Sequence, residues 1–174
     1  MKSNRSSQKG VGLIEILVAL LVLAIGILGF IALQYRAVEA TSEAINRVQA
    51  MNIARDMAER IRANRDGFAT YKSQTSDPGN QAGFTINCMT ATCTAANLAD
   101  FDVAQVTQKA SNLGMTVNML PCVENQDGRN CLYVAWGDTS ATNGNGSGDC
   151  TKGTSYNNGS VGNRPSTCVI METY

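Results

Sequence analysis

Six cysteines, and one carboxylate inside an apolar run, are the side chains of this 174-residue chain whose type and spacing could do chemistry. The sequence contains no histidine, which excludes a Ser-His-Asp triad, a Cys-His pair, histidine metal ligands and an imidazole proton shuttle. We therefore expect no enzyme activity, no catalytic residue, no metal and no cofactor. The length suits one domain, or one domain with an appendage.

The cysteines all lie in the second half of the chain, and their even number predicts disulfides formed in an oxidising compartment. Six cysteines allow 15 pairings, among which the sequence alone does not choose. Proximity along the chain favours two short pairs and leaves the third by elimination. A zinc site is the alternative, but it would need pairs separated by two residues. The favoured pairs are Cys88–Cys93, Cys122–Cys131 and Cys150–Cys168.

Residues 16–33 are apolar or glycine, and the stretch from Gly10 to Tyr35 is long enough to cross a bilayer. Glu15 is the only charged residue in that stretch. Residues 1–10 carry three basic residues and no acid, so they should stay in the cytoplasm, with the chain beyond the apolar run on the far side of the membrane.

Two ordinary explanations of the apolar run are weaker. A secretory signal would have a shorter apolar core and a small-residue cleavage site after it, and neither feature is present before Gln34. A plain membrane anchor would not explain Glu15, because a carboxylate in a spanning segment is costly and usually has a partner. A solvated carboxylate at the membrane edge remains the alternative for Glu15.

The helix is expected to continue beyond the membrane, since residues 36–64 contain no Pro or Gly and are rich in good helix formers. A helix over 11–64 would be about 80 Å long. Apolar residues at spacings of three and four predict one apolar face in its second half, packed on a domain. They are Ile45, Val48, Ile53, Met57 and Ile61.

The segment from Lys9 to Glu15, followed by the apolar run, resembles the N-terminus of type IV pilins and their relatives. The resemblance implies that a prepilin peptidase cuts between Gly10 and Val11, and that the new N-terminus at Val11 is methylated. Phenylalanine or methionine is commoner than valine at this place in the family. The resemblance also implies that Glu15 pairs with the free amine of a neighbouring subunit during filament assembly.

Two further stretches resemble PilV-type minor pilins, also called type IV pilus modification proteins. The first is DMAERIRANR at residues 56–65, and the second is CTAANLADFD at residues 93–102. The second predicts a short helix capped by Thr94 and ended by Gly114, with Asp100 and Asp102 as acids that stabilise its start. The family's tryptophan near Val106 is missing here.

Three strands are expected in the remainder: residues 116–120, 131–136 and 167–172. The run Asn125-Gln126-Asp127-Gly128 is typical of a hairpin turn between the first two strands. A long helix on a small antiparallel sheet, stapled by disulfides, is the α+β pilin architecture. The glycine-rich residues 137–164 predict a flexible exposed loop tied down by Cys150 and Cys168. A phosphate-binding loop is excluded, because the segment lacks the Gly-Lys-Ser/Thr ending and no helix pattern follows it.

These expectations define four parts of the chain. They are a leader (residues 1–10), a membrane and filament-core segment (11–35), an amphipathic helix (36–65) and a periplasmic globular head (66–174).

The predicted function is a minor pilin that primes or caps a type IV pilus. Its partners would be the prepilin peptidase, other minor pilins, the major pilin and a tip adhesin. It would move from the inner membrane to the extracellular pilus, at its tip. The alternative is a minor pseudopilin of a type II secretion system. DNA binding is disfavoured, because residues 66–174 hold five basic against nine acidic residues, and no nucleic acid is expected as a partner.

Overall fold

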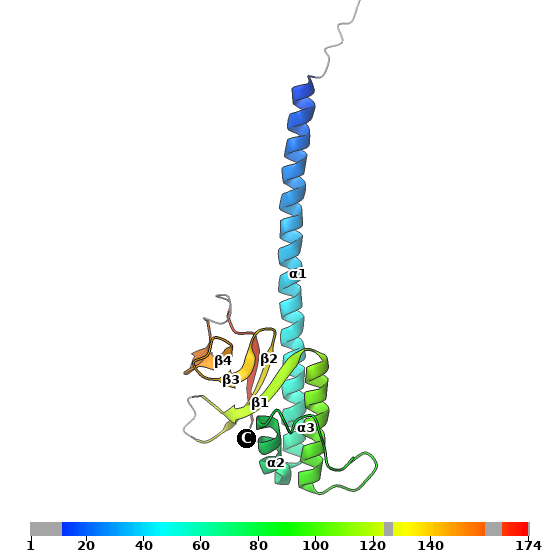
Figure 1. The fold of residues 1–174 in the computed structure, drawn as a ribbon, viewed down its shortest axis with the longest axis vertical. Helices are drawn as coiled ribbons and strands as arrows, with labels where there is room; N and C mark the ends of the chain where they lie inside the picture. Colours follow the sequence, from blue (N-terminus) through cyan, green and yellow to red (C-terminus); the bar gives the residue numbers. More distant parts are fainter. Residues whose placement is uncertain (1–11, 124–126, 159–164, 174) are drawn as a thin grey trace, which may run out of the picture. The chain divides into compact units, whose positions relative to one another are not determined.

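The computed structural model of the chain describes residues 12–123, 127–158 and 165–173 (Figure 1). The chain divides into two compact units between Ala44 and Ile45. The expected cleavage residues Gly10 and Val11, and the expected turn residues Asn125 and Gln126, lie outside the described residues.

The first helix, α1 (Leu13–Ala63), is continuous over 51 residues, close to the length predicted from the apolar run and the helix formers that follow it. Side chains at 12–42 are exposed throughout. From Ala50 onward one face is buried, and it includes Ile53, Met57 and Ile61 as predicted. The prediction that Ile45 and Val48 belong to this packed face was wrong, because they are 51% and 60% exposed.

Three shorter helical elements follow in the second unit. A 3-10 turn, η1 (Arg65–Gly67), leads into α2 (Phe68–Ser76), and α3 (Ala95–Asn112) comes after a long connection. Thr94 caps α3 as predicted, because its Oγ1 accepts a hydrogen bond from the Asn97 amide at 3.2 Å. Gly114, with φ of +69°, stands directly after the end of α3.

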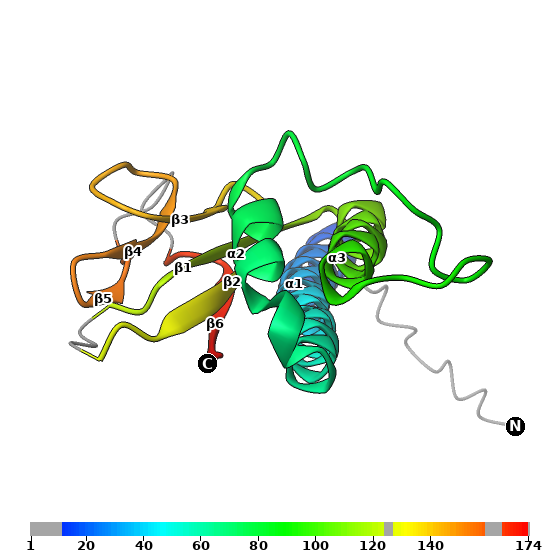
Figure 2. The ribbon, with the colours of Figure 1, turned by 90° about the horizontal axis from the view of Figure 1, so that it is seen from below.

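The main sheet has three antiparallel strands in the order β1-β2-β6 (Figures 1 and 2). They are β1 (Met115–Pro121), β2 (Asn130–Trp136) and β6 (Cys168–Glu172), which confirms the three predicted strands. Alternation places Val117, Leu132 and Val169 in the core with the buried face of α1 and with α3. Tyr133 lies in a second cluster. The sheet is therefore packed on both faces, which explains why every residue of β2 is buried.

The prediction of a loop over residues 137–164 was wrong for much of its length. A second small sheet forms there from β3 (Ser140–Asn143), β4 (Asp149–Lys152) and β5 (Ser155–Tyr156), in that order. Strands β3 and β4 are parallel with a register shift. Residues 159–164 lie outside the described part of the chain.

Three disulfides join the predicted pairs, two of them favoured by proximity along the chain and the third left by elimination. Cys122–Cys131 closes the β1–β2 hairpin near its turn. Cys150–Cys168 ties β4 of the small sheet to β6 of the main sheet, and both cysteines are buried. Cys88–Cys93 closes a short loop before α3.

Replacing Cys150 and Cys168 together by alanine is expected to lower the free energy of unfolding by about 3 kcal/mol, since this bridge closes the longest loop, 18 residues. The matched control replaces Cys88 and Cys93, whose loop is 5 residues, with an expected loss of about 2 kcal/mol. Denaturant unfolding of the full chain in detergent, followed by the fluorescence of Trp136, measures both losses. A larger loss for the short loop would contradict this order.

Candidate assembly sites

Glu15 lies in the first turn of α1, where a carboxylate is stabilised by the unpaired N–H groups at the start of a helix. Its own backbone N–H donates to the Gly12 carbonyl at 2.9 Å. In residues 12–123, 127–158 and 165–173, no side chain forms an ion pair with its carboxylate. Any cation that pairs with Glu15 therefore comes from outside the described part of this chain.

The apolar side chains that follow Glu15 are exposed around the whole helix. Ile16 is 51% exposed and Leu33 71% exposed, and the large residues between them are half exposed or more. The helix is long and apolar enough to cross a membrane by length and composition. Such a surface needs either lipid or other apolar helices around it, because water disfavours so large an apolar area.

In the second unit, α1 and α3 lie beside each other (Figure 2), and a cluster of polar side chains joins them. Asp56 and Arg60 are four residues apart and lie along one side of α1, and Asn64 directly follows the last residue of that helix. The Asn64 amide Nδ2 donates to the Ala95 carbonyl at 2.8 Å, at the start of α3. Three residues of the run at 56–65 therefore lie close together, and they connect the end of α1 to α3.

Arg60 is the centre of the cluster. Its Nε donates to Asp56 Oδ1 at 2.8 Å, and its Nη1 donates to Asp102 Oδ1 at 2.5 Å and to Gln105 Oε1 at 3.2 Å. The Tyr71 hydroxyl of α2 donates to the other oxygen of Asp102. Arg60 thus binds α1 to α3, and the buried Asp102 binds both of them to α2.

Burial and charge shift the pKa values of Tyr71 and Asp56 in this cluster. Burial, followed by the hydrogen bond to Asp102, raises the pKa of Tyr71 well above its ordinary value of 10.0. Burial alone would raise the pKa of Asp56, but the hydrogen bonds and positive charges of Arg60 and Lys109 outweigh it and hold that pKa below its ordinary value. The cluster is therefore ionised at Asp56 and neutral at Tyr71 near pH 7.

The interpretation of Asp100 and Asp102 as acids that stabilise the helix start was wrong. Neither lies in the first turn of α3, and both are less than a tenth exposed. Asp100 Oδ2 accepts from the Thr85 amide at 2.8 Å and holds the long connection before α3. Sequence reasoning also missed Tyr71 and Gln105, because no local pattern marks their contacts with partners more than 30 residues away.

Two other groups that could suggest chemistry have local structural roles. Asp149 in the glycine-rich segment accepts hydrogen bonds from Thr142 Oγ1 at 2.5 Å and from the Gly146 amide at 2.7 Å. All six cysteines are in disulfides. Across the described residues, no group of three or more His, Cys, Asp or Glu side chains could hold a metal ion.

Comparison with known protein families gives two matches, which cover the apolar helix and most of the polar cluster. Residues 32–104 match the Tt1218-like family, described as Type IV pilin Tt1218, and residues 5–31 match the prokaryotic N-terminal methylation motif. Over these residues the chain is similar to type IV pilins. Comparison with curated proteins and with solved structures gives no significant match.

The match at 32–104 covers Asp56 and Arg60 on α1 and Asp102 on α3, while Gln105 lies one residue beyond it. The methylation motif at 5–31 covers Glu15 and implies processing by a prepilin peptidase. Proteins of the family are structural and not enzymes. The apolar part of α1 accordingly serves first in the membrane and then in a pilus.

Asp102→Asn is expected to lower the free energy of unfolding by about 3 kcal/mol, because it leaves Arg60 without its most buried counter-charge. Asp56→Asn is the matched control on the same arginine, and it should cost about 1 kcal/mol or less. The two carboxylate side chains are 10% and 29% exposed respectively, which sets this order. Urea unfolding of the full chain in detergent measures both losses, and equal losses would rule out Asp102 as the main contact.

Stability is expected to fall as the pH rises above about 10, the ordinary pKa of tyrosine. There the unfolded chain loses the Tyr71 proton while the folded chain keeps it, so the unfolded state binds fewer protons and is favoured. Tyr71→Phe should make this decline shallower without abolishing it, since burial also raises the pKa of Tyr133. Unfolding free energies measured between pH 8 and 11 test this, and parallel curves for the two proteins would contradict it.

Proposed function

We propose that this protein is a PilV-type minor pilin that primes or caps the assembly of a type IV pilus. The supporting observation is a contact between the two stretches that resemble PilV-type proteins. Arg60 of the first stretch, 56–65, binds Asp102 of the second, 93–102. Asn64 and Ala95 make a second contact between the same stretches. The resemblance therefore involves residues that touch one another in the fold.

In this proposal the prepilin peptidase cuts between Gly10 and Val11, and the new N-terminus at Val11 is methylated. The leader is residues 1–10, and 11–35 serve as the membrane and filament-core segment. Residues 36–65 form the amphipathic part of the helix, and 66–174 form the periplasmic head. Removing the leader leaves 11 basic and 14 acidic side chains in place of 14 of each, so the assembled subunit is acidic.

Glu15 acts at the moment of assembly. A carboxylate among apolar helices is favourable only beside a cation, and the free α-amino group of a neighbouring subunit is such a cation. The first-turn position of Glu15 and the exposed apolar residues that follow it support this role. The ion pair fixes the register of the helices, and the apolar surface then packs among them.

The partners in this proposal are other minor pilins, the major pilin and a tip adhesin, with the subunit at the pilus tip. A minor pseudopilin of a type II secretion system would share the leader and Glu15, so it is the second outcome of the test. DNA capture is disfavoured by the excess of acidic residues in the head.

Deleting the gene is expected to reduce surface pili and twitching, because a primer of assembly would be missing. Expression of the natural sequence should restore both, whereas Glu15→Ala should remain in the membrane and restore neither. The quantities to measure are sheared pilin per cell and the amount of each variant in membrane and pilus fractions.

Glu39→Ala, a change to an exposed acid farther along α1 from its N-terminal end, is the matched control and should behave as the natural sequence does. Normal piliation in the deletion strain would overturn the proposed role, and a secretion defect in that strain would favour the pseudopilin.

A further inference from the structure

Among the described residues, strand β6 pairs with β2 alone, so it is an edge of the main sheet. The Thr173 amide donates to Asn130 at 2.8 Å, and the Trp136 amide donates to Thr167 at 3.1 Å. In an antiparallel pair, successive residues of a strand point their backbone N–H and C=O groups alternately toward and away from the neighbouring strand. The two bonds show that the backbone groups of residues 167, 169, 171 and 173 point toward β2. Those of Cys168, Ile170 and Glu172 point away from the sheet, and none of them has a backbone partner among the described residues.

A side of α1 within the second unit carries three exposed arginines: Arg47, Arg55 and Arg62. Their spacings of eight and seven residues correspond to about two helical turns each, so they form one line along the helix. In the described part of the chain none of the three makes an ion pair, in contrast to Arg36, Arg60 and Arg129.

Two hollows lie between the three arginines of α1 and the outer edge of β6. One hollow of about 560 Å³ is lined on the helix side by Arg47, Met51 and Arg55 and on the strand side by Cys168 and Ile170. Its apolar lining includes Val48 and Tyr156, which are 60% and 48% exposed. A second hollow, of about 530 Å³, lies at the other end of β6.

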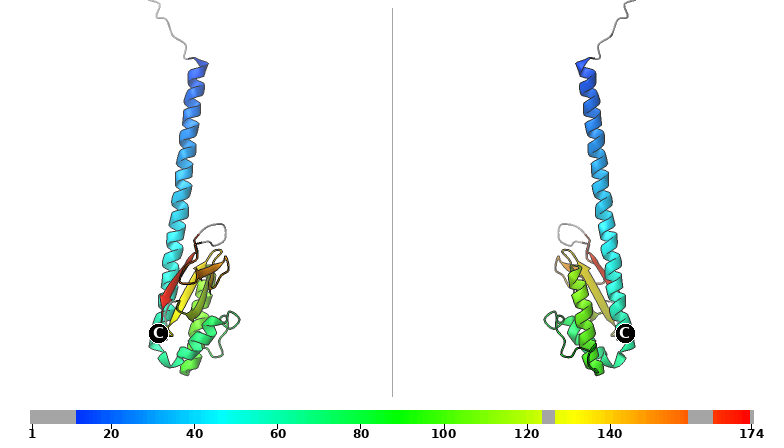
Figure 3. Two further views of the ribbon diagram at one scale, coloured as in Figure 1. Left: turned by 90° about the vertical axis from the view of Figure 1, so that its left-hand side faces the viewer. Right: turned by 90° about the vertical axis from the view of Figure 1, so that its right-hand side faces the viewer.

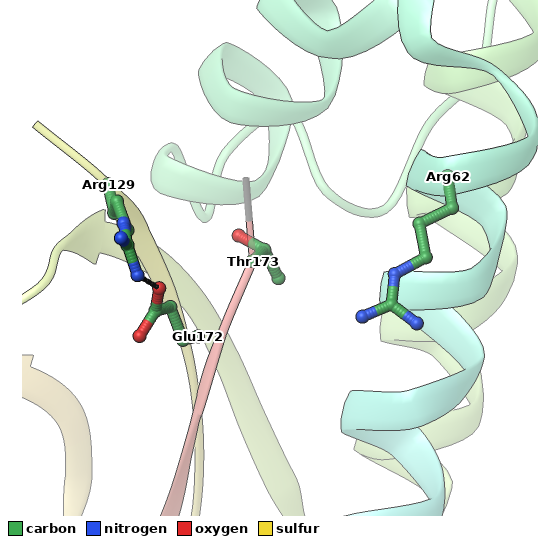
Figure 4. A pocket seen from close by; sticks show the side chains of 4 residues that line it. All are labelled: Arg62, Arg129, Glu172 and Thr173. Atoms are coloured by element: carbon green, nitrogen blue, oxygen red, sulfur yellow. Dashed lines mark hydrogen bonds and ion pairs between the residues drawn. The ribbon is translucent and has the colours of Figure 1, made fainter.

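Figure 4 shows the second hollow from close by. Arg62 extends from α1 on one side, and the ion-paired Arg129 and Glu172 lie on the other, with Thr173 between them. No interaction joins Arg62 to the other three residues drawn. The line of unpaired arginines therefore extends along the length of β6.

We propose that the groove formed by the two hollows between β6 and the three arginines of α1 binds an extended acidic segment of a partner protein. This segment adds to the sheet as a strand beside β6. The outward N–H and C=O groups of Ile170 and its neighbours supply the main-chain hydrogen bonds of strand addition. Alternate carboxylates of the segment meet Arg47, Arg55 and Arg62, and alternate apolar side chains cover Val48 and Met51.

A second copy of the chain does not fit as the occupant. Pairing two β6 edges would bring two arginine lines together, and like charges at an interface oppose association. The charge of the groove instead selects an acidic partner. The inference does not depend on the proposed priming role, because binding is measured on the purified full chain, so either can fail alone.

The test uses the full chain in detergent micelles and a fluorescein-labelled peptide of alternating valine and glutamate as the probe. Anisotropy titration is expected to show binding that weakens about tenfold when glutamate is replaced by lysine, and equally when alternate peptide nitrogens are methylated. The Ile170 amide should exchange its hydrogen more slowly in the presence of the probe. Arg47→Glu with Arg55→Glu should weaken binding about tenfold or more.

Lys72→Glu, a charge reversal on the exposed side of α2, is the control and should change the affinity less than twofold. Circular dichroism spectra that match the natural protein show that the variants remain folded. An affinity that methylation of the peptide does not lower, or that the two arginine reversals do not lower, would overturn the proposal. Tighter binding of an oligothymidine of the same length would also overturn it, in favour of a nucleic acid.

Discussion

The structure depends on an apolar helical surface that the described part of the chain does not cover. From Leu13 to Leu33 the side chains of α1 remain exposed, although the same helix is well packed from Ala50 onward. Water disfavours the first segment, so it requires lipid before assembly and neighbouring helices after it. The change along one helix from uncovered to packed explains why a type IV pilin can be both a membrane protein and a filament subunit.

The packed part of α1 is held to the head by charge as well as by apolar contact. Arg60 reaches Asp102 on α3, and Tyr71 on α2 binds the same carboxylate. A half-buried ion pair of this kind contributes little net free energy when intact but is costly to break, so it fixes which faces meet. The two side views in Figure 3 show the sheet and the shorter helices gathered around this end of α1.

Local signals in the sequence predicted most of the fold. The apolar run and the helix formers predicted α1, and alternation predicted β1, β2 and β6. Proximity predicted two disulfides, and elimination gave the third. The second sheet was missed, because its strands are short and polar and two of them pair in parallel. The partner of Arg60 was missed for a different reason. It lies 42 residues away, and only tertiary structure brings the two together.

Sequence reasoning also identified Glu15 but not its environment. The structure adds that Glu15 lies in the first turn of a helix whose apolar residues from Ile16 to Leu33 are exposed. This arrangement suits a subunit whose N-terminal helix is inserted among others and whose head determines its neighbours. The proposed groove beside β6 is a similar case, because within the described residues its strand edge and its arginines have no partner.

The most direct measurement is mass spectrometry of the N-terminus of this protein recovered from sheared pili. The account predicts a chain that begins at Val11, carries a methyl group on its α-amino nitrogen and is present in the pilus fraction. A chain that keeps residues 1–10, or that is found only in the membrane fraction, would contradict it.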